Sequence, residues 1–527
     1  MHSVTDNPLI ASLLLTQAYQ HKTGAIQLIE THISWVLLTG DFAYKIKKPV
    51  NFGFLDFSTL EKRQFYCQEE LRLNQRFCAE LYLEVVAVTG TPAEPVMAGT
   101  GTAIEYAVKM RQFEAGNLLS ERAGNGLLSY DDIDGIAQVL GIFHLEAPAA
   151  DAGSAYGDPQ TVKHWCEENF DHLEPLLQDA AELQTVQHLK SWVITEWQQK
   201  AGIMHQRKQQ GFVRECHGDL HLGNIALING KITPFDCIEF NPMLRWIDVI
   251  SEIAFVLMDL DYRGFKPYAW RLLNTYLQQT DDYPGLNILR YYLVYRALVR
   301  AKVALLSEQQ LSDNAERQRK HEEYIRHIAL AERYTQPVKP ALLITHGFSG
   351  SGKSFHARKL AEEIGAIHLR SDIERKRLFG FASLDNTGSA AQDGIYTEKA
   401  GEQTYQHLAA MAAIALQSGF HVIVDATFLK RAQRDLFLKL AQSLSLPVRI
   451  LDFTASVTTL QQRIARRQQL QNDASEATAE ILQQQLAGAE AFSTNEREYI
   501  ITVDTEHQDI HTVLLQKISN LLRSVLS

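Results

Sequence analysis

At 527 residues the chain is too long for one ordinary domain, and its 46% hydrophobic and 21% charged residues are typical of a globular protein. No apolar run reaches the roughly 18 residues of a membrane-spanning helix, and the N-terminal segment lacks a basic leader and a cleavage site. We therefore expect a cytoplasmic protein without a membrane partner. The net charge of −11 disfavours general nucleic-acid binding, because affinity for phosphate backbones needs a basic surface.

The cysteines are scattered, odd in number and form no CxxC pair, so we expect reduced thiols that build neither a disulfide framework nor a zinc site. They are Cys67, Cys78, Cys166, Cys216 and Cys237.

Residues 1–110 are predicted to form a small β-rich lobe. Strand-like runs at 26–38 and 42–48 flank Thr39-Gly40-Asp41, which indicates a hairpin. The later elements expected in this lobe are a helix over 59–77 and strands at 81–88 and 102–110.

Residues 111–335 read as a mostly helical lobe, interrupted by a segment rich in Gly, Asp and Asn at 217–241. A small sheet-rich lobe before a larger helical lobe predicts a two-lobed α+β domain. The segment Tyr334–Ala341 holds two prolines between a charged helical stretch and a new apolar run. This break predicts a domain boundary near residue 338 and a separate domain over 336–527.

Strand and helix patterns alternate after this boundary. The run 341–347 reads as a strand, and 353–365 reads as a helix with apolar residues at helical spacing and a closing glycine. Further strands are expected at 366–372, 421–427 and 447–453. The alternation predicts an α/β domain with a mostly parallel sheet covered on both faces.

Residues 347–354 match the phosphate-loop motif G-x-x-x-x-G-K-[ST] in full, between an expected strand and an expected helix. Its backbone amides and the helix N-terminus favour a bound phosphate, so we expect ATP and Mg²⁺ here. Lys353 should reach the β- and γ-phosphates, and the Ser354 hydroxyl should hold Mg²⁺. A glycine-rich turn with a chance Lys-Ser pair is the alternative. The residues assigned to nucleotide binding are Gly347, Ser349, Gly350, Ser351, Gly352, Lys353 and Ser354.

Two carboxylates support this site, each with a plainer alternative as a helix N-cap. Asp425 ends the apolar run 421–425, where a metal-associated carboxylate would lie beside the phosphate loop. Asp372 follows the second strand and could accept the proton of an acceptor hydroxyl, while Arg375 would bind a substrate phosphate.

Arg463, Arg466 and Arg467 fall on one expected helix. They could cover the transferring phosphate, which needs cationic groups in its transition state, or form a solvated basic face. We favour the first interpretation for Arg463 and Arg467. Residues 340–520 as a whole resemble the small P-loop kinases, the AAA_33, gluconate-kinase, zeta-toxin and polynucleotide-kinase-like group, which implies phosphoryl transfer to a small molecule or a nucleic-acid end.

The first domain carries a second phosphotransfer pattern at His217–Asn224, H-x-D-x-x-x-x-N. Asp219 would accept the acceptor proton, and Asn224 would hold Mg²⁺. The Asn229-Gly230 turn then returns the chain to Asp236, a second metal carboxylate. A metal-only site of His217, Asp219 and His221 is the alternative, although it leaves Asn224 unexplained.

This chemistry also needs a strand lysine and a helical glutamate to anchor ATP. Phe42-Ala43-Tyr44-Lys45 has the shape of the kinase V-A-I-K segment, and Lys47 shares the same face. The expected partner is Glu70 or its neighbour Glu69 on the following helix.

Residues 25–330 resemble the aminoglycoside phosphotransferase group of protein-kinase-like folds, on the segments 217–224 and 234–240. Residues 245–254 and 295–300 look like later helices of that group. No clean G-x-G-x-x-G is present, only Thr39-Gly40-Asp41. The two halves together resemble bacterial fusions of such a domain with a P-loop domain.

The resemblance implies a bifunctional ATP-dependent phosphotransferase acting on hydroxyls of small molecules such as a sugar, a nucleoside or a nucleotide end. Two alternatives stay open. The P-loop domain could be a nucleotide-binding regulatory module, or the target could be a protein or RNA. The sequence indicates no oligomeric state.

Overall fold

The computed structural model describes residues 7–53, 55–382, 385, 395, 397–470, 478–507 and 509–524. The chain forms two compact units, each assembled from two stretches of sequence. The first unit is Met1–Tyr262 with Tyr291–Glu332, and the second is Arg263–Arg290 with Arg333–Ser527.

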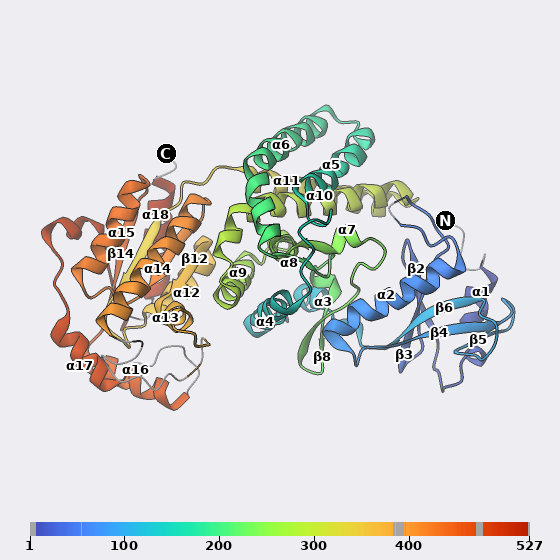
Figure 1. Ribbon diagram of the computed structural model, residues 1–527, viewed down its shortest axis with the longest axis horizontal. Helices are drawn as coiled ribbons and strands as arrows, with labels where there is room; N and C mark the ends of the chain where they lie inside the picture. Colours follow the sequence, from blue (N-terminus) through green and yellow to red (C-terminus); the bar gives the residue numbers. More distant parts are fainter. Residues whose placement is uncertain are drawn as a thin grey trace. The chain divides into compact units, whose positions relative to one another are not determined.

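The first unit begins with a six-stranded antiparallel sheet in the order β1-β2-β3-β6-β4-β5, with helix α2 packed against β4 and β6 (Figure 1). Its strands are β1 (Gln27–Glu30), β2 (Ser34–Leu38), β3 (Phe42–Lys47), β4 (Tyr82–Gly90), β5 (Pro95–Met97) and β6 (Glu105–Arg111), and α2 spans Leu60–Cys78. The predicted hairpin at Thr39-Gly40-Asp41 is confirmed, because β2 pairs antiparallel with β3 on either side of it.

The run 26–38, expected as one strand, is a hairpin in itself. Strands β1 and β2 pair with one another across residues 31–33. The Thr31 hydroxyl accepts a hydrogen bond from Ser34 N at 2.9 Å, and Thr31 N donates to Ser34 O at 2.9 Å. This side-chain turn competes with a continuous strand, as Thr commonly does.

The rest of the first unit is mostly helical, as predicted. Helix α8 (Val249–Tyr262) is central, since every residue from Val249 to Leu260 is buried. The helix expected over 245–254 begins only at Val249, because Trp246–Asp248 form strand β10, which pairs with β7 (Val213–Glu215). The other helices of this lobe are α3 (Leu119–Gly124), α4 (Tyr130–Glu146), α5 (Pro159–Leu173), α6 (Ala180–Gln209), α7 (Pro242–Arg245), and the larger parts of α10 (Leu286–Gln310) and α11 (Asn314–Thr335).

The segment 217–241 carries a short hairpin of β8 (Ile225–Ile228) and β9 (Lys231–Pro234). Asn229 and Gly230 join the two strands with φ values of 50° and 75°. Both central residues of this two-residue turn are left-handed, which Asn-Gly pairs adopt readily. The Asn-Gly turn predicted from the sequence is therefore confirmed.

The second unit contains a five-stranded sheet in the order β12-β13-β11-β14-β15, and all of its pairings are parallel. Helices α12 and α18 contact one another, as do α14 and α15, and Figure 1 shows helices on either side of the sheet. The predicted α/β class is confirmed. The strands are β11 (Leu342–His346), β12 (Ala366–Arg370), β13 (His421–Asp425), β14 (Val448–Thr454) and β15 (Ile500–Asp504), and the helices are α12 (Lys353–Ile364), α13 (Ser371–Leu378), α14 (Glu398–Gln417), α15 (Arg431–Ser443), α16 (Val457–Leu470), α17 (Ala479–Gly488) and α18 (Ile510–Ser524).

The second unit also takes in α9 (Lys266–Thr280), from the sequence range expected for the helical lobe. Asn274 Nδ2 donates to Ala366 O at 3.0 Å, and Asn274 Oδ1 accepts from His368 N at 2.8 Å. Gln278 Nε2 donates to His368 O at 3.0 Å. Because β12 is an edge strand with unpaired backbone groups, these amide side chains take the place of a neighbouring strand.

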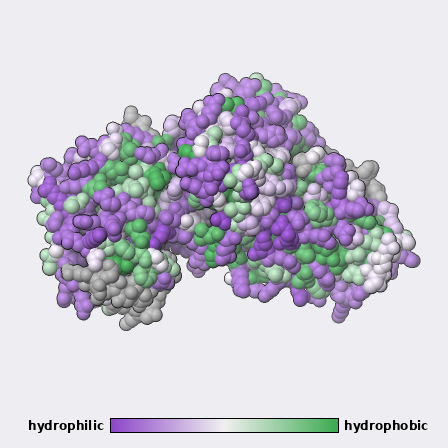
Figure 2. All heavy atoms as spheres, viewed as in Figure 1, coloured by the Kyte–Doolittle hydropathy of each residue, from purple (hydrophilic) through white to green (hydrophobic). Residues whose placement is uncertain are grey.

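Among the residues that the structure describes, no helix is both long enough and apolar enough to cross a bilayer. Figure 2 shows hydrophilic side chains interspersed with smaller apolar areas over the visible face.

Candidate active sites

The phosphate loop of the second unit connects β11 to α12. Gly347, Gly350 and Gly352 have φ values of 135°, 85° and 84°. A Cβ at Gly347 would lie 2.4 Å from Phe453 O, and one at Gly350 would lie 2.7 Å from Leu460 O. These two positions therefore require glycine for two reasons: the backbone has a positive φ, and the backbone of another segment approaches too closely for a side chain.

Lys353 begins α12 and points back over the loop, with its Nζ donating to Phe348 O at 2.8 Å. Burial lowers the pKa of Lys353 to about 8, although the charges of Asp425 and Asp372 oppose that shift. A buried ammonium at the N-terminus of a helix makes this loop strongly favourable for an anion.

A cavity of about 280 Å³ brings most of the predicted residues of this domain together. Its lining includes the phosphate loop, both carboxylates and cationic side chains of α13 and α16. The predicted residues on its wall are Ser349, Gly350, Gly352, Lys353, Ser354, Asp372, Arg375, Asp425, Arg463 and Arg467. Arg466 is exposed and Ser351 is buried, and neither lines the cavity.

Neither carboxylate is a helix N-cap in the structure. Helix α13 has Arg370 at its N-cap position, and α15 has Lys430. Asp425 Oδ2 instead lies 3.4 Å from His368 Nε2. Burial raises the pKa of Asp425, but His368, Arg370 and Lys353 lower it more, so the net pKa lies below its ordinary value and the carboxylate is ionised at neutral pH.

Arg463, expected to cover the transferring phosphate, is hydrogen-bonded to the phosphate loop itself. Its guanidinium donates to Thr505 Oγ1 at 2.8 Å and to Gly350 O at 3.4 Å. The same loop is held from α17, where Gln485 Oε1 accepts from Ser349 N at 2.9 Å and Gln485 Nε2 donates to Ser349 Oγ at 3.0 Å.

Several cavity residues were missed from the sequence. Thr427 lies two residues after Asp425, just beyond the end of β13, so its position was a usable signal. Tyr405 and Gln485 come from α14 and α17 with no local pattern that marks them.

The loop at His217–Asn224 in the first unit is held from inside the helical lobe. Asn224 Nδ2 donates to Asp219 O at 2.9 Å and lies 3.3 Å from Asp219 Oδ2. The buried carboxylate of Glu252 on α8 accepts His217 N at 2.8 Å and Gly218 N at 3.2 Å. About two turns further along α8, a second carboxylate accepts a hydrogen bond from the backbone of the loop: Asp259 Oδ2 accepts Leu222 N at 2.9 Å.

Asp219 lies in a positive environment. His221 Nε2 is 3.8 Å from Asp219 Oδ2. Burial raises the pKa of Asp219, but the charges of His221 and Arg300 lower it more, and the net pKa is below the ordinary value. An ionised carboxylate is the form that can accept a proton. His217 Nε2 forms a hydrogen bond with Phe235 O at 2.7 Å, so this ring nitrogen is taken up by the protein backbone. This contact disfavours the alternative in which His217 and Asp219 bind a metal ion together.

The two candidate lysines share one glutamate. Lys45 Nζ lies 2.8 Å from Glu70 Oε1 and 2.5 Å from Asp236 Oδ1. Lys47 Nζ lies 2.7 Å from Glu70 Oε2 and also bonds Glu239. Burial lowers the pKa of Lys45, but Asp236 and Glu70 raise it more, so its net pKa is well above the ordinary value.

Glu69 lies apart from these lysines. It pairs with Arg72 at 2.9 Å and with Arg245 at 3.4 Å. Lys47 is fully buried, whereas Asp236 exposes 42% of its side chain. Lys45, beside Asp236, is therefore the lysine with access to a ligand.

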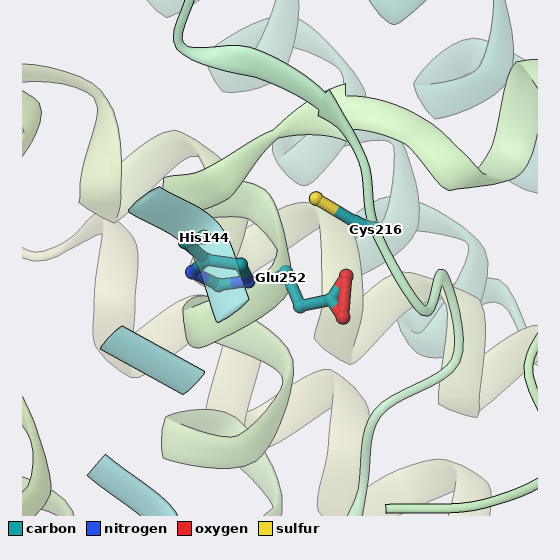
Figure 3. Close-up of side chains that lie close together, drawn as sticks. All are labelled: His144, Cys216 and Glu252. Atoms are coloured by element: carbon teal, nitrogen blue, oxygen red, sulfur yellow. The ribbon is translucent and has the colours of Figure 1, made fainter. Parts of the chain in front are cut away.

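Figure 3 shows His144, Cys216 and Glu252 close together, on α4, on the segment after β7 and on α8. Their ligand atoms lie within 4.8 Å of one another, and all three are buried, so the set could hold a metal ion. Both Glu252 oxygens already accept backbone N–H groups, at 2.8 Å and 2.9 Å from His217 N. The Glu252 carboxylate therefore serves first to support the loop at His217–Asn224.

Residues 342–492 match the AAA_33 family, an AAA domain. An uncharacterized protein of Mycobacterium tuberculosis strain H37Rv is 29% identical over 483 residues, 91% of this chain and 90% of that protein. A gluconokinase from Sinorhizobium meliloti 1021 is 21% identical over 36% of this chain and 97% of its own, with a TM-score of 0.26. A choline/ethanolamine kinase family protein from Mesorhizobium loti is 12% identical over 63% of this chain and 99% of its own, with a TM-score of 0.36. The phosphate loop and the residues that line its cavity all lie within 342–492, the range that matches the AAA_33 family.

Proposed function

We propose that the chain is a bifunctional ATP-dependent phosphotransferase, in which each unit transfers the γ-phosphoryl group of Mg·ATP to a hydroxyl group of a small molecule. In each transfer the acceptor oxygen forms a bond to Pγ, the bond from Pγ to the bridging oxygen of ADP breaks, and the hydroxyl proton passes to a carboxylate. That carboxylate is Asp219 in the first unit and Asp372 in the second.

The observation that carries the proposal is the composition of the cavity in the second unit. Asp372 and Arg375 share this cavity with Lys353 of the phosphate loop. A regulatory module needs only to bind a nucleotide, whereas a transferase also needs a base and an acceptor-binding cation beside the γ-phosphate. The presence of both groups supports transfer over regulation. A volume of about 280 Å³ suits a small acceptor or the end of a chain.

The first unit offers the same set of roles from different elements. Lys45 would bind the nucleotide phosphates, and Glu70 fixes the lysine at 2.8 Å. Asp219 would accept the proton. The Asn224 amide is anchored to the backbone of Asp219, so it lies beside the base, and Asp236 lies 2.5 Å from Lys45, so it lies beside the lysine.

The residues present also fit Mg²⁺, which prefers oxygen ligands and keeps several waters. Asn224 and Asp236 would hold it in the first unit, and Ser354 and Asp425 would hold it in the second. When bound, the ion would neutralise charge on the transferring phosphates. The low net pKa of Asp236 and Asp425 keeps both carboxylates ionised for that role.

The acceptor of the first unit is proposed as a small molecule, and that of the second as a small molecule or a nucleic-acid end. A cytoplasmic location fits both, since ATP and metabolites are abundant there.

The test is mass spectrometry of a metabolite and oligonucleotide extract incubated with Mg·ATP and the full chain. Wild type, Asp219→Asn and Lys353→Ala are compared. The proposal predicts two sets of new phosphorylated species, each lost in one variant and retained in the other. If both variants lose the same species, there is a single activity; if no species forms although ATP binds, the regulatory or macromolecular-target alternatives replace the proposal.

A further inference from the structure

His368 is a buried side chain that the proposed chemistry leaves unused. It lies in the middle of β12 and is 3% exposed. Its Nε2 atom lies 3.4 Å from Asp425 Oδ2, within ion-pair distance, and forms no hydrogen bond with any described residue. A buried polar atom without a hydrogen bond is costly, so the position of this nitrogen beside the carboxylate calls for an explanation.

The sheet register explains how the two side chains meet. His368 pairs with Ile423, and Arg370 pairs with Asp425, on the neighbouring parallel strands β12 and β13. Asp425 is two residues beyond Ile423, so it projects from the same face of the sheet as His368. Diagonal neighbours at this spacing are within reach of a long side chain.

The backbone of His368 is fixed from outside the sheet. Asn274 Oδ1 accepts His368 N at 2.8 Å, and Gln278 Nε2 donates to His368 O at 3.0 Å. Both amides belong to α9, so a helix from a distant part of the sequence holds the backbone that carries the imidazole. The ring in turn meets only one oxygen of the carboxylate.

We propose that His368 is a positioning residue for Asp425: its Nε2–H holds Oδ2, so that Oδ1 is presented to Mg²⁺ at the phosphate loop. This inference rests on the proposed function of the second unit. An ionised carboxylate can only accept hydrogen bonds, so the imidazole must be the donor. Partners of this kind fix the orientation of a metal-binding group without touching the metal, and their loss commonly costs about 10-fold to 100-fold in metal affinity.

The test measures nucleotide binding by the full chain carrying Lys45→Met, so that the second unit alone reports. A fluorescent ATP analogue is titrated with excess Mg²⁺ and again with EDTA. Three substitutions are compared: His368→Leu removes the donor, His368→Gln places an amide nitrogen near the position of Nε2, and His368→Asn places one near Nδ1. His421→Gln is the control, because His421 is a β13 histidine whose Nδ1 accepts Ala341 N at 3.0 Å, away from Asp425.

We expect His368→Leu and His368→Asn to weaken binding with Mg²⁺ by about 10-fold or more and to leave binding in EDTA unchanged. His368→Gln should retain most of the gain in affinity that Mg²⁺ gives over EDTA, and His421→Gln should retain all of it. The inference is overturned if His368→Leu matches the parent chain with Mg²⁺, or if it loses affinity equally with and without the metal.

Thermal unfolding of each variant identifies any that fails to fold. If His368→Leu does not fold, Asn274→Ala replaces it, because it releases the backbone of His368 and should lower the magnesium effect in the same direction. Lys353→Ala separates the two levels of the proposal. If it leaves nucleotide binding unchanged, the function proposed for the second unit fails, and the role of His368 fails with it.

Discussion

Lys45 and Glu70 form a buried ion pair, with 2.8 Å between Lys45 Nζ and Glu70 Oε1. The other oxygen of the same carboxylate lies 2.7 Å from Lys47 Nζ. One glutamate therefore orients two lysines that stand two residues apart on β3. Their surroundings differ, since Lys45 also meets the half-exposed Asp236 and Lys47 meets the buried Glu239.

This difference predicts separate roles for the two lysines. Lys45→Met should lower phosphotransfer by the first unit by about 100-fold or more, because a cation aimed at the transferring phosphates is lost. Lys47→Met should instead destabilise the first unit by about 3–5 kcal/mol, because it leaves Glu239 buried with an unpaired charge and removes one of the two lysine partners of Glu70. Product formation and denaturant unfolding measure the two effects. A variant of Lys47 that folds normally and is merely inactive would contradict this division.

Glu252 is predicted to maintain the loop that carries Asp219. Glu252→Gln keeps the shape but replaces one oxygen by an NH₂ group, which then faces the backbone N–H groups of His217 and Gly218. We expect a loss of about 1–3 kcal/mol in unfolding free energy, together with loss of the first activity and retention of the second. Glu84→Gln is a matched control, because its bond to Lys109 at 2.9 Å is on a side chain that is 56% exposed. An effect of Glu252→Gln no larger than that of the control would refute the assignment.

The buried His327 predicts a pH dependence of stability. Its ring stacks on Tyr262 with 3.8 Å between centroids, and burial lowers the pKa of His327 from 6.5 to about 4. Between these values the unfolded chain binds a proton that the folded chain does not, so stability falls as the pH falls from 6.5 towards 4. Other buried histidines, such as His144, add to this slope, since burial lowers the pKa of His144 to about 4 as well.

His327→Asn keeps a donor for Glu323 O, which His327 Nδ1 contacts at 2.8 Å, but it cannot titrate. We expect the acid-dependent loss of unfolding free energy to become shallower by up to about 1.4 kcal/mol per pH unit. Denaturant unfolding at several pH values between 4 and 7 measures the slope. A slope identical to that of the wild type would show that His327 titrates normally in the folded state.

The parts of the sites that could be predicted from the sequence are those formed by residues that are contiguous in the chain. The phosphate loop, the loop at His217–Asn224 and the Asn-Gly turn each have a local pattern with a physical requirement. The choice between Glu69 and Glu70 was also within reach. Glu70 lies on the buried stripe of α2 with Cys67, Leu73 and Asn74, at helical spacing, and Glu69 does not.

The parts that could not be predicted depend on long-range contacts. Glu252 supports a loop more than 30 residues away in the sequence, and Gln485 binds the phosphate loop from 136 residues away. Neither has a local signature. The helical pattern of α9 is the same whichever unit it joins, and long-range contacts, such as the bonds of Asn274 and Gln278 to β12, associate it with the second unit.

The central claim is that one chain holds two separate nucleotide sites, and calorimetric titration of the full chain with Mg²⁺ and a non-hydrolysable ATP analogue tests it most directly. We predict two bound nucleotides per wild-type chain, one for Lys45→Met, one for Lys353→Ala and none for the double variant. A wild-type chain that binds one nucleotide, or a Lys45→Met chain that still binds two, would contradict the account.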